Sequence, residues 1–100
     1  MAAFRQSSAV VAVPGTAVAL SAVSLPVRSF DIMAKKVTGA NTGVVYLGNS
    51  TVDYATNQGI KLVVDAYWEK HAPPGDTIDL AEVYIDADTA GDGVVFNYYI

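Results

Sequence analysis

The residues best suited to bind a metal ion lie in one short acidic run near the C-terminal end of the sequence. Asp86, Asp88 and Asp92 stand close together, and hard cations such as Ca²⁺ take several oxygen ligands from a single loop. The run departs from the EF-hand pattern, because Ala90 and Asn97 stand where that pattern needs an oxygen ligand and a glutamate. The three aspartates are therefore weak metal candidates, and the alternative is a β-hairpin connection that uses an Asp-Gly pair.

No arrangement typical of a catalytic centre occurs in the sequence. His71 is the only histidine and stands near a double proline, and the chain contains no cysteine. Disulfide bonds and a thiolate zinc site are therefore excluded. No serine motif accompanies His71, which we interpret as a surface residue, and no glycine-rich phosphate loop is present. We expect no catalytic residues, no cofactor and a non-enzymatic role.

The tyrosines are the most informative residues for function. In the alternation of the predicted strands, Tyr67, Tyr84 and Tyr99 face outward, whereas Phe96 and Tyr98 face the core. Outward aromatic side chains suit a protein interface or a platform on which sugars stack. The alternative is that they finish the core or cover the edge of a sheet. The three outward tyrosines are therefore interface candidates.

Charge is scarce and unevenly distributed along the chain. The net charge is −4, charged residues make up 16% of the sequence and apolar residues 52%. All acidic residues except Asp31 lie in the second half, whereas most basic residues lie in the first. This polarity fits either one acidic solvated face or complementary ends that bring neighbouring copies together. The negative net charge gives little electrostatic support to binding nucleic acid. The low proportion of charged residues suggests that a partner covers part of the surface.

Short strands separated by turns must position these side chains. Residues 60–70 fit either a strand or an amphipathic helix, and we favour a strand because the flanking segments are all short strands. No apolar span approaches the roughly 20 residues of a membrane helix, so we expect no membrane partner. The seven to eight predicted strands indicate an all-β fold, a small β-sandwich or jelly roll. The segments with strand periodicity are residues 8–13, 16–23, 29–34, 44–47, 52–54, 60–70, 78–86 and 94–100.

A single domain over residues 9–100 accounts for the length and the even composition. Residues 1–8 precede the first predicted strand and show no periodicity. We therefore expect an N-terminal arm that lies across a neighbouring subunit. Phe4 and Arg5 of this arm are two further interface candidates.

Five stretches of turn and strand residues stand out together, namely residues 14–21, 26–29, 43–50, 80–86 and 91–94. They resemble a family of small virion proteins of tailed bacteriophages, which are similar to capsid decoration (cement) proteins. The resemblance spans residues 14–96 and departs from the family pattern near residues 67–74. It implies a β-sandwich structural part without catalytic residues that forms a homotrimer on the capsid surface of the virion. The implied partners are the major capsid protein and copies of the chain itself.

A binding module is the alternative function that the residues leave open. Such a module would belong to a head fibre, a neck or a tail. It would recognise a sugar or a host protein through the outward tyrosines, and loss of glycan binding on replacing Tyr67 or Tyr99 by alanine would favour it.

Overall fold

The structure is a computed structural model that describes residues 3–100. Strands account for 46% of the chain and helix for 3%, which confirms the predicted all-β class. Within the described part, no helix is long and apolar enough to cross a membrane. The elements are β1 (Phe4–Val10), β2 (Val18–Ala19), β3 (Pro26–Val27), β4 (Ser29–Met33), β5 (Val45–Gly48), β6 (Ile60–Leu62), β7 (Tyr67–His71), β8 (Ile78–Asp79), the 3₁₀ helix η1 (Leu80–Glu82), β9 (Tyr84–Ala87) and β10 (Gly93–Tyr99).

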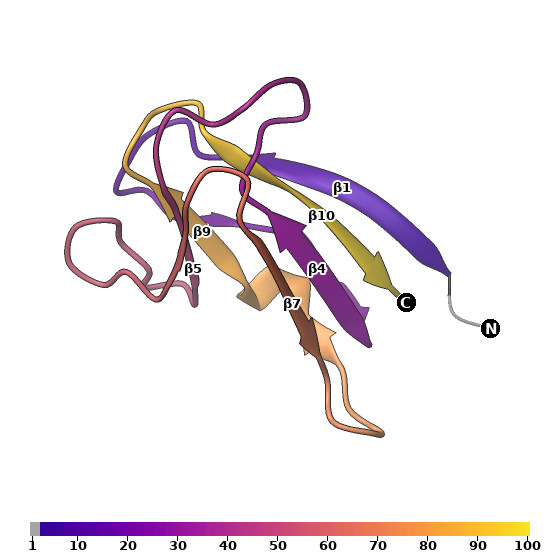
Figure 1. Ribbon diagram of the computed structural model, residues 1–100. Helices are drawn as coiled ribbons and strands as arrows, with labels where there is room; N and C mark the ends of the chain where they lie inside the picture. The colour runs from indigo at the N-terminus through magenta and orange to yellow at the C-terminus, as the bar shows by residue number, and fades with distance from the viewer. Residues whose placement is uncertain (1–2) are drawn as a thin grey trace.

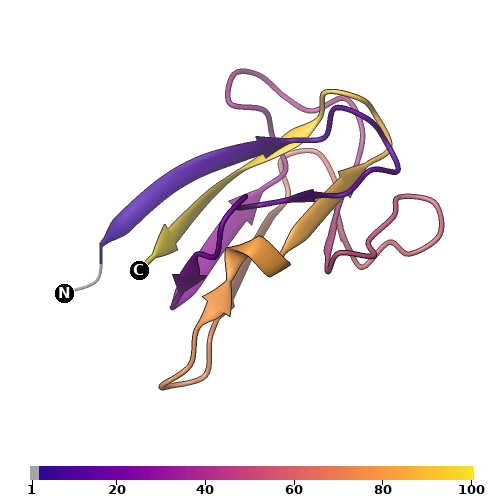
Figure 2. The same ribbon diagram turned by 180° about the vertical axis from the view of Figure 1, so that it is seen from behind.

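Two four-stranded antiparallel sheets form the two layers of the sandwich (Figure 1). Sheet A has the strand order β1-β10-β4-β7, and sheet B has the order β2-β9-β5-β6. The short strands β3 and β8 form a separate pair. Neighbouring strands within each sheet are mostly distant in sequence. For example, β1 and β10, the first and last strands, lie side by side in sheet A (Figure 2).

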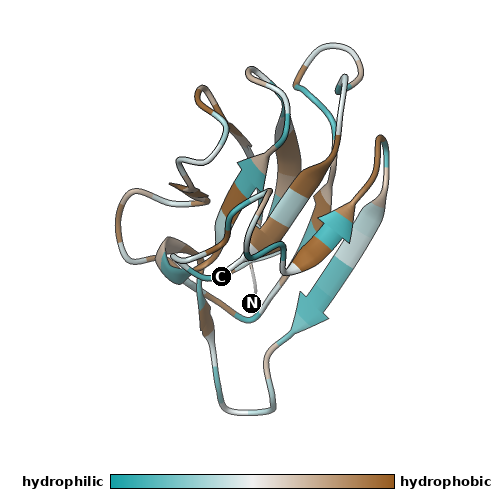
Figure 3. Ribbon diagram, turned by 90° about the vertical axis from the view of Figure 1, so that its left-hand side faces the viewer, coloured by the Kyte–Doolittle hydropathy of each residue, from teal (hydrophilic) through white to brown (hydrophobic). Residues whose placement is uncertain are grey.

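The core lies between the two sheets and follows the predicted alternation. In sheet A, Ile32 and Phe96 are fully buried, and in sheet B the same holds for Ile85. Tyr98 and Trp68 also point inward and pack against the core cluster. Apolar and polar bands alternate along several strands (Figure 3), as expected where one face of each sheet is covered and the other is open.

The strand preferred over a helix at residues 60–70 is present, but it is divided into β6 and β7, which belong to different sheets. The chain turns between them at Asp65, whose φ of 63° lies in the left-handed region. The Asp65 N–H donates to the Ala34 carbonyl, and the Ala66 N–H donates to the Val63 carbonyl. Apolar residues continue through this turn, so periodicity alone did not reveal the break.

The predicted N-terminal arm is wrong for the residues that the structure describes. Residues 4–8 belong to β1, which pairs with β10 from the Phe4–Tyr99 pair to the Val10–Gly93 pair. Residues 1–2 of the predicted arm lie outside the described residues. The strand lacks periodicity because it is an edge strand exposed on both faces, so burial imposes no alternation on it. The domain therefore includes β1 and does not start at residue 9.

Candidate interaction face and the acidic loops

One face of sheet A points away from the core and carries most of the aromatic candidates. The ladder registers arrange its side chains in rows that cross all four strands. We call this surface the outer face. Its residues are Phe4, Gln6, Ser8 and Val10 of β1, Val95, Asn97 and Tyr99 of β10, Ser29, Asp31 and Met33 of β4, and Tyr67, Glu69 and His71 of β7.

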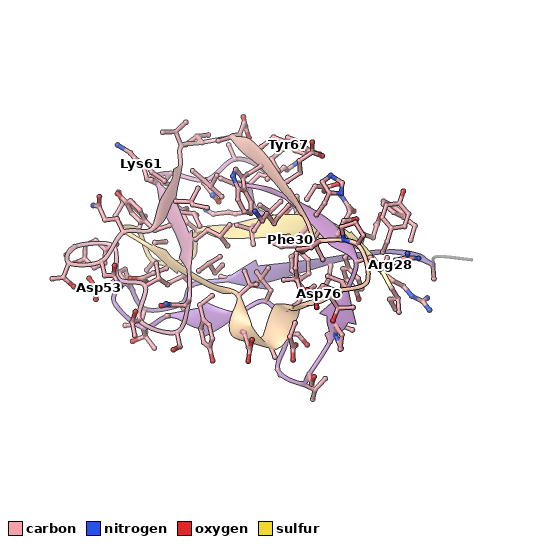
Figure 4. The ribbon with its side chains drawn as sticks, turned by 90° about the horizontal axis from the view of Figure 1, so that it is seen from below. Arg28, Phe30, Asp53, Lys61, Tyr67 and Asp76 are labelled. Carbon is pink, nitrogen blue, oxygen red and sulfur yellow. The ribbon has the colours of Figure 1, made fainter. Side chains whose placement is uncertain are left out.

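Aromatic side chains stand at two places on the outer face. Phe4 and Tyr99 are directly opposite each other, and their ring centroids lie 5.3 Å apart. Tyr67 lies on the other edge strand, where its side chain is at the surface while Phe30 of β4 points inward (Figure 4). Phe4 and Tyr67 are each 55% exposed and Tyr99 is 44% exposed. Val10, which is 48% exposed, is the other large apolar side chain that this face leaves exposed.

A polar row separates the two aromatic places. It crosses the sheet in the order Gln6, Asn97, Asp31 and Glu69. The Asn97 side-chain amide donates to Asp31 Oδ1 at 2.9 Å. Asp31 and Glu69 are directly opposite, an arrangement of like charges that is unfavourable in an isolated sheet. The row therefore places hydrogen-bonding groups and negative charge on the outer face.

Glu69 is bracketed by its two neighbours on the same side of β7. The Tyr67 hydroxyl donates to Glu69 Oε2 at 3.1 Å, and His71 Nε2 lies 3.9 Å from the same oxygen. Desolvation, followed by this hydrogen bond to the carboxylate, raises the pKa of Tyr67 above its ordinary value. The Tyr67 hydroxyl therefore has a hydrogen-bond partner on its own strand, while its ring stays exposed.

Two shallow hollows lie on the outer face. One of about 240 Å³ is lined by Phe4, Tyr99, Asp31 and His71, among others. The other, of about 410 Å³, lies over the β1–β10 pair and is bounded on one side by Val37 of the loop after β4. Both hollows are partly open to solvent, a form that suits contact with a surface or with a chain of sugar rings more than an enclosed small molecule.

The remaining two interface candidates lie elsewhere. Tyr84 is on β9 of sheet B, where it lines a separate hollow of about 390 Å³ together with Asn49 and Glu82. Arg5 is exposed on β1 but alternates with Phe4, so it is on the opposite side of the sheet, across from Tyr98. The structure therefore brings Phe4, Tyr67 and Tyr99 onto one face and leaves Tyr84 and Arg5 apart from it.

The weak metal candidates hold loops in place. Asp86 is fully buried, and its carboxylate accepts the Gly15 N–H at 3.0 Å and the Tyr54 N–H at 2.8 Å. Asp88 is exposed and accepts the Val44 N–H at 3.0 Å. Backbone N–H groups present positive charge to the carboxylate oxygens, so these oxygens already have partners.

Asp92 has the same role at the start of β10. It is fully buried and accepts the Thr42 N–H at 2.9 Å and the Gly43 N–H at 2.6 Å. Lys36 Nζ lies 3.7 Å from the same carboxylate. Among residues 3–100, no cluster of three or more His, Cys, Asp or Glu side chains is placed to hold a metal ion. The aspartates of this run therefore join distant loops to the ends of β9 and β10.

The predicted β-hairpin connection at residues 86–93 is wrong. The segment leaves β9 in sheet B and enters β10 in sheet A, so it crosses from one layer to the other. A glycine is required where it enters β10, because a Cβ at Gly93 would collide with the carbonyl oxygen of Ala9. The side chain of Asn41 pairs with the Gly93 backbone, donating to its carbonyl at 2.8 Å and accepting from its N–H at 3.1 Å.

Several residues of the outer face were not predicted as site residues. Asp31, Glu69 and Asn97 come from three strands, and they meet only through the registers of β10, β4 and β7. His71 is exposed, as expected for a surface residue, but it ends β7 and contributes to the face. The odd-numbered positions of residues 29–33 were a signal, since they share a side that the core does not cover.

The sequence and the fold were compared with those of known proteins. No protein-family model, curated protein or solved structure matches this chain.

Proposed function

We propose that this chain is a non-enzymatic structural component of a bacteriophage virion, a decoration (cement) protein that bridges neighbouring subunits on the capsid surface. Its proposed partners are the major capsid protein and copies of itself, arranged as a trimer. The observation that carries the proposal is the outer face, where Phe4, Tyr67 and Tyr99 are exposed together on one sheet. The resemblance of residues 14–96 to small phage virion proteins is the reason for proposing a phage virion as the particle.

The exposed aromatic rings of the outer face can contribute part of the binding energy of an interface. An aromatic side chain can bury roughly 150–250 Å², and apolar burial contributes about 25 cal/mol per Å². Three half-exposed rings therefore contribute several kcal/mol, which is comparable to the cost of association of about 4–15 kcal/mol. One contact of this kind is weak, and many symmetry-related copies would reinforce a shell through multivalency.

The polar row of the face fits the same function. The opposed carboxylates of Asp31 and Glu69 repel each other and would repel nucleic acid. A donor-rich or basic patch on a neighbouring subunit would relieve that repulsion when it covers the face. Charge complementarity of this kind sets orientation and partner choice more than affinity.

The test is the copy number of the chain in purified particles of the phage that encodes it. Hundreds of copies per particle are expected for decoration, whereas a dozen or fewer would place the chain in a neck or tail. Absence from the particles would refute a virion role.

A second measurement tests the face itself. Particles that lack the chain should release their genome at lower temperature, and added wild-type protein should restore the release temperature. The double variant Phe4→Ser, Tyr99→Ser should fail to restore it. The matched control is Val23→Ser, which removes an apolar side chain that is 71% exposed in a loop away from the outer face. Equal restoration by the double variant and the control would exclude the outer face as the contact.

One observation favours a second function, a sugar-binding module on a head fibre, neck or tail. The hollow of about 240 Å³ places the rings of Phe4 and Tyr99 beside the hydrogen-bonding groups of Asp31 and Asn97. An exposed ring next to amide and carboxylate groups is suited to stack against and orient a sugar. Binding on a glycan array that is lost in Tyr99→Ala and kept in Tyr84→Ala would support this function. An array without any bound glycan would contradict it.

A further inference from the structure

Within residues 3–100, strand β1 is a sheet edge with no strand on its open side (Figures 1 and 2). It is seven residues long, every residue but Ala9 is exposed, and Arg5 is its only charged residue. It contains no proline, and the chain pairs all of it with β10 on the other side. A long edge that carries a single charge is a template for a further strand.

The other edges of the two sheets are blunted in the ways that natural proteins use. Strand β7, the far edge of sheet A, carries Glu69, Lys70 and His71 within five residues. The edges of sheet B are β2 and β6, which are two and three residues long. Among the described strands, β1 is thus the edge that remains open to pairing.

The backbone groups on the open side of β1 can be identified from the ends of its ladder. The Val11 N–H donates to the Asp92 carbonyl at 2.9 Å, and the Ile100 N–H donates to the Ala3 carbonyl at 3.1 Å. Odd-numbered residues of β1 therefore direct their N–H and C=O groups toward β10, and even-numbered residues direct theirs away from it. The residues with outward backbone groups are Phe4, Gln6, Ser8 and Val10.

We propose that β1 pairs antiparallel with β1 of a second copy of this chain, about a two-fold axis at Ser7. In this register Phe4 is opposite Val10 of the second copy, and Gln6 is opposite Ser8 of the second copy. Both are pairs of even-numbered residues, so they are the pairs that exchange two N–H···O bonds. The two A sheets then form one continuous intermolecular sheet, an isologous contact of the kind that closes a dimer.

The sequence of β1 is complementary to itself in this register. Phe4 and Val10, which are both about half exposed, gain an apolar neighbour on the outer face, and the Gln6–Ser8 pairs between them are polar. Arg5 is opposite Ala9 of the second copy, so no like charges meet. Moving the axis to Gln6 would leave Val10 unpaired, and moving it to Arg5 would oppose two arginines.

This contact goes beyond the decoration function and does not depend on it. A two-fold pair does not build the trimer that the family resemblance implies, so any trimer would use a different surface. Pairing through β1 would join two outer faces side by side. The tests below use the isolated protein in solution, so their failure leaves the proposed role on a capsid untouched.

A single introduced cysteine tests the register. The chain has no cysteine of its own. In the proposed dimer the two Ser7 residues form a non-hydrogen-bonded pair with Cα atoms about 4.5 Å apart, which is within reach of a disulfide. Ser7→Cys should therefore give a covalent dimer under mild oxidation, seen on a non-reducing gel. Ser8→Cys is the matched control, because its two copies would lie beyond the roughly 7 Å limit for Cα atoms in a disulfide.

Charge reversal tests the same contact without a covalent bond. Ser7→Lys and Ser7→Asp each place like charges on the axis and should weaken dimerisation on the order of tenfold or more. An equimolar mixture of the two variants should restore the dimer, and Ser8→Lys should leave it largely intact. Sedimentation equilibrium measures the dissociation constants, and Trp68 fluorescence checks that each variant is folded.

Wild-type protein should show a species of twice the chain mass of 10.5 kDa. A purely monomeric wild type would overturn the proposal. So would cross-linking of Ser8→Cys as efficient as that of Ser7→Cys, or a mixture of the charged variants that stays monomeric.

Discussion

Replacement of Asp86 by alanine tests whether the acidic run holds loops or binds metal. Asp86 is fully buried and accepts the N–H groups of Gly15 and Tyr54. Hydrogen bonds to a charged group contribute about 1.5–3 kcal/mol each. The contribution of each bond should be near the lower end of this range, because Gly15 lies at the surface and water can reach its released N–H. The expected loss is therefore about 3 kcal/mol from the free energy of unfolding.

This loss is large for a chain of this size. A domain of 100 residues has a total stability of roughly 5–15 kcal/mol, and a loss of about 3 kcal/mol should lower Tm by roughly 12–24 °C. Denaturant unfolding followed by the fluorescence of Trp68 measures the change. Trp68 is the only tryptophan, and its ring packs against Phe30 with centroids 5.9 Å apart, so its emission reports loss of contact within the core.

Two further variants make the result decisive. Asp88→Ala removes the same kind of side chain from the same run, but Asp88 is exposed, so it should cost less than about 1 kcal/mol. Asp86→Asn keeps the shape and loses the charge, and it should cost about 1 kcal/mol. The stability loss of Asp86→Asn can still be measured if the Asp86→Ala variant does not fold. A loss from Asp86→Ala no larger than that from Asp88→Ala would refute the reasoning.

Three other outcomes follow from the same contacts. Addition of Ca²⁺ or EDTA should leave Tm unchanged, because backbone N–H groups already engage Asp86 and Asp92; a rise in Tm with Ca²⁺ would restore the metal interpretation. Backbone N–H groups of Leu25 and Ala81 hold the pKa of Asp79 below its ordinary value of 3.8. Its ionised form therefore stabilises the fold above that pH, and this contribution is lost as the pH falls through the lower folded pKa. Asp79→Asn should accordingly show a smaller fall in Tm on acidification than wild type, and parallel curves would contradict this. Gly93→Ala should cost about 1–3 kcal/mol by overpacking, because its Cβ would meet the Ala9 carbonyl and separate β1 from β10; unchanged amide protection in β1 by hydrogen exchange would argue against it.

Local patterns were sufficient for the fold class and for the direction of most core side chains. Alternation in residues 94–100 placed Phe96 and Tyr98 inside and Tyr99 outside, as the structure shows. Such patterns succeed because a strand with one buried face imposes a period of two on its own sequence. They failed at β1, which is exposed on both faces, and at residues 63–66, where apolar residues continue through a turn.

The candidate face itself could not be read from local patterns. Phe4 meets Tyr99, and Asp31 meets Glu69, only because strands far apart in sequence are neighbours in sheet A. Strand order and register follow from the packing of the whole chain, and no short segment contains that information. The same holds for the hydrogen bonds of the buried Asp86 carboxylate, because its donors, Gly15 and Tyr54, belong to two loops from distant parts of the chain.

The sequence by itself therefore determined that this protein is an all-β chain with outward tyrosines and no recognisable catalytic motif, since residue type and period are local properties. The tertiary structure decided which of those side chains share a face and which aspartates are buried. It also decided that β1 is an edge strand of sheet A, because the N–H and C=O groups of a strand stay unpaired only on a side where no neighbouring strand lies.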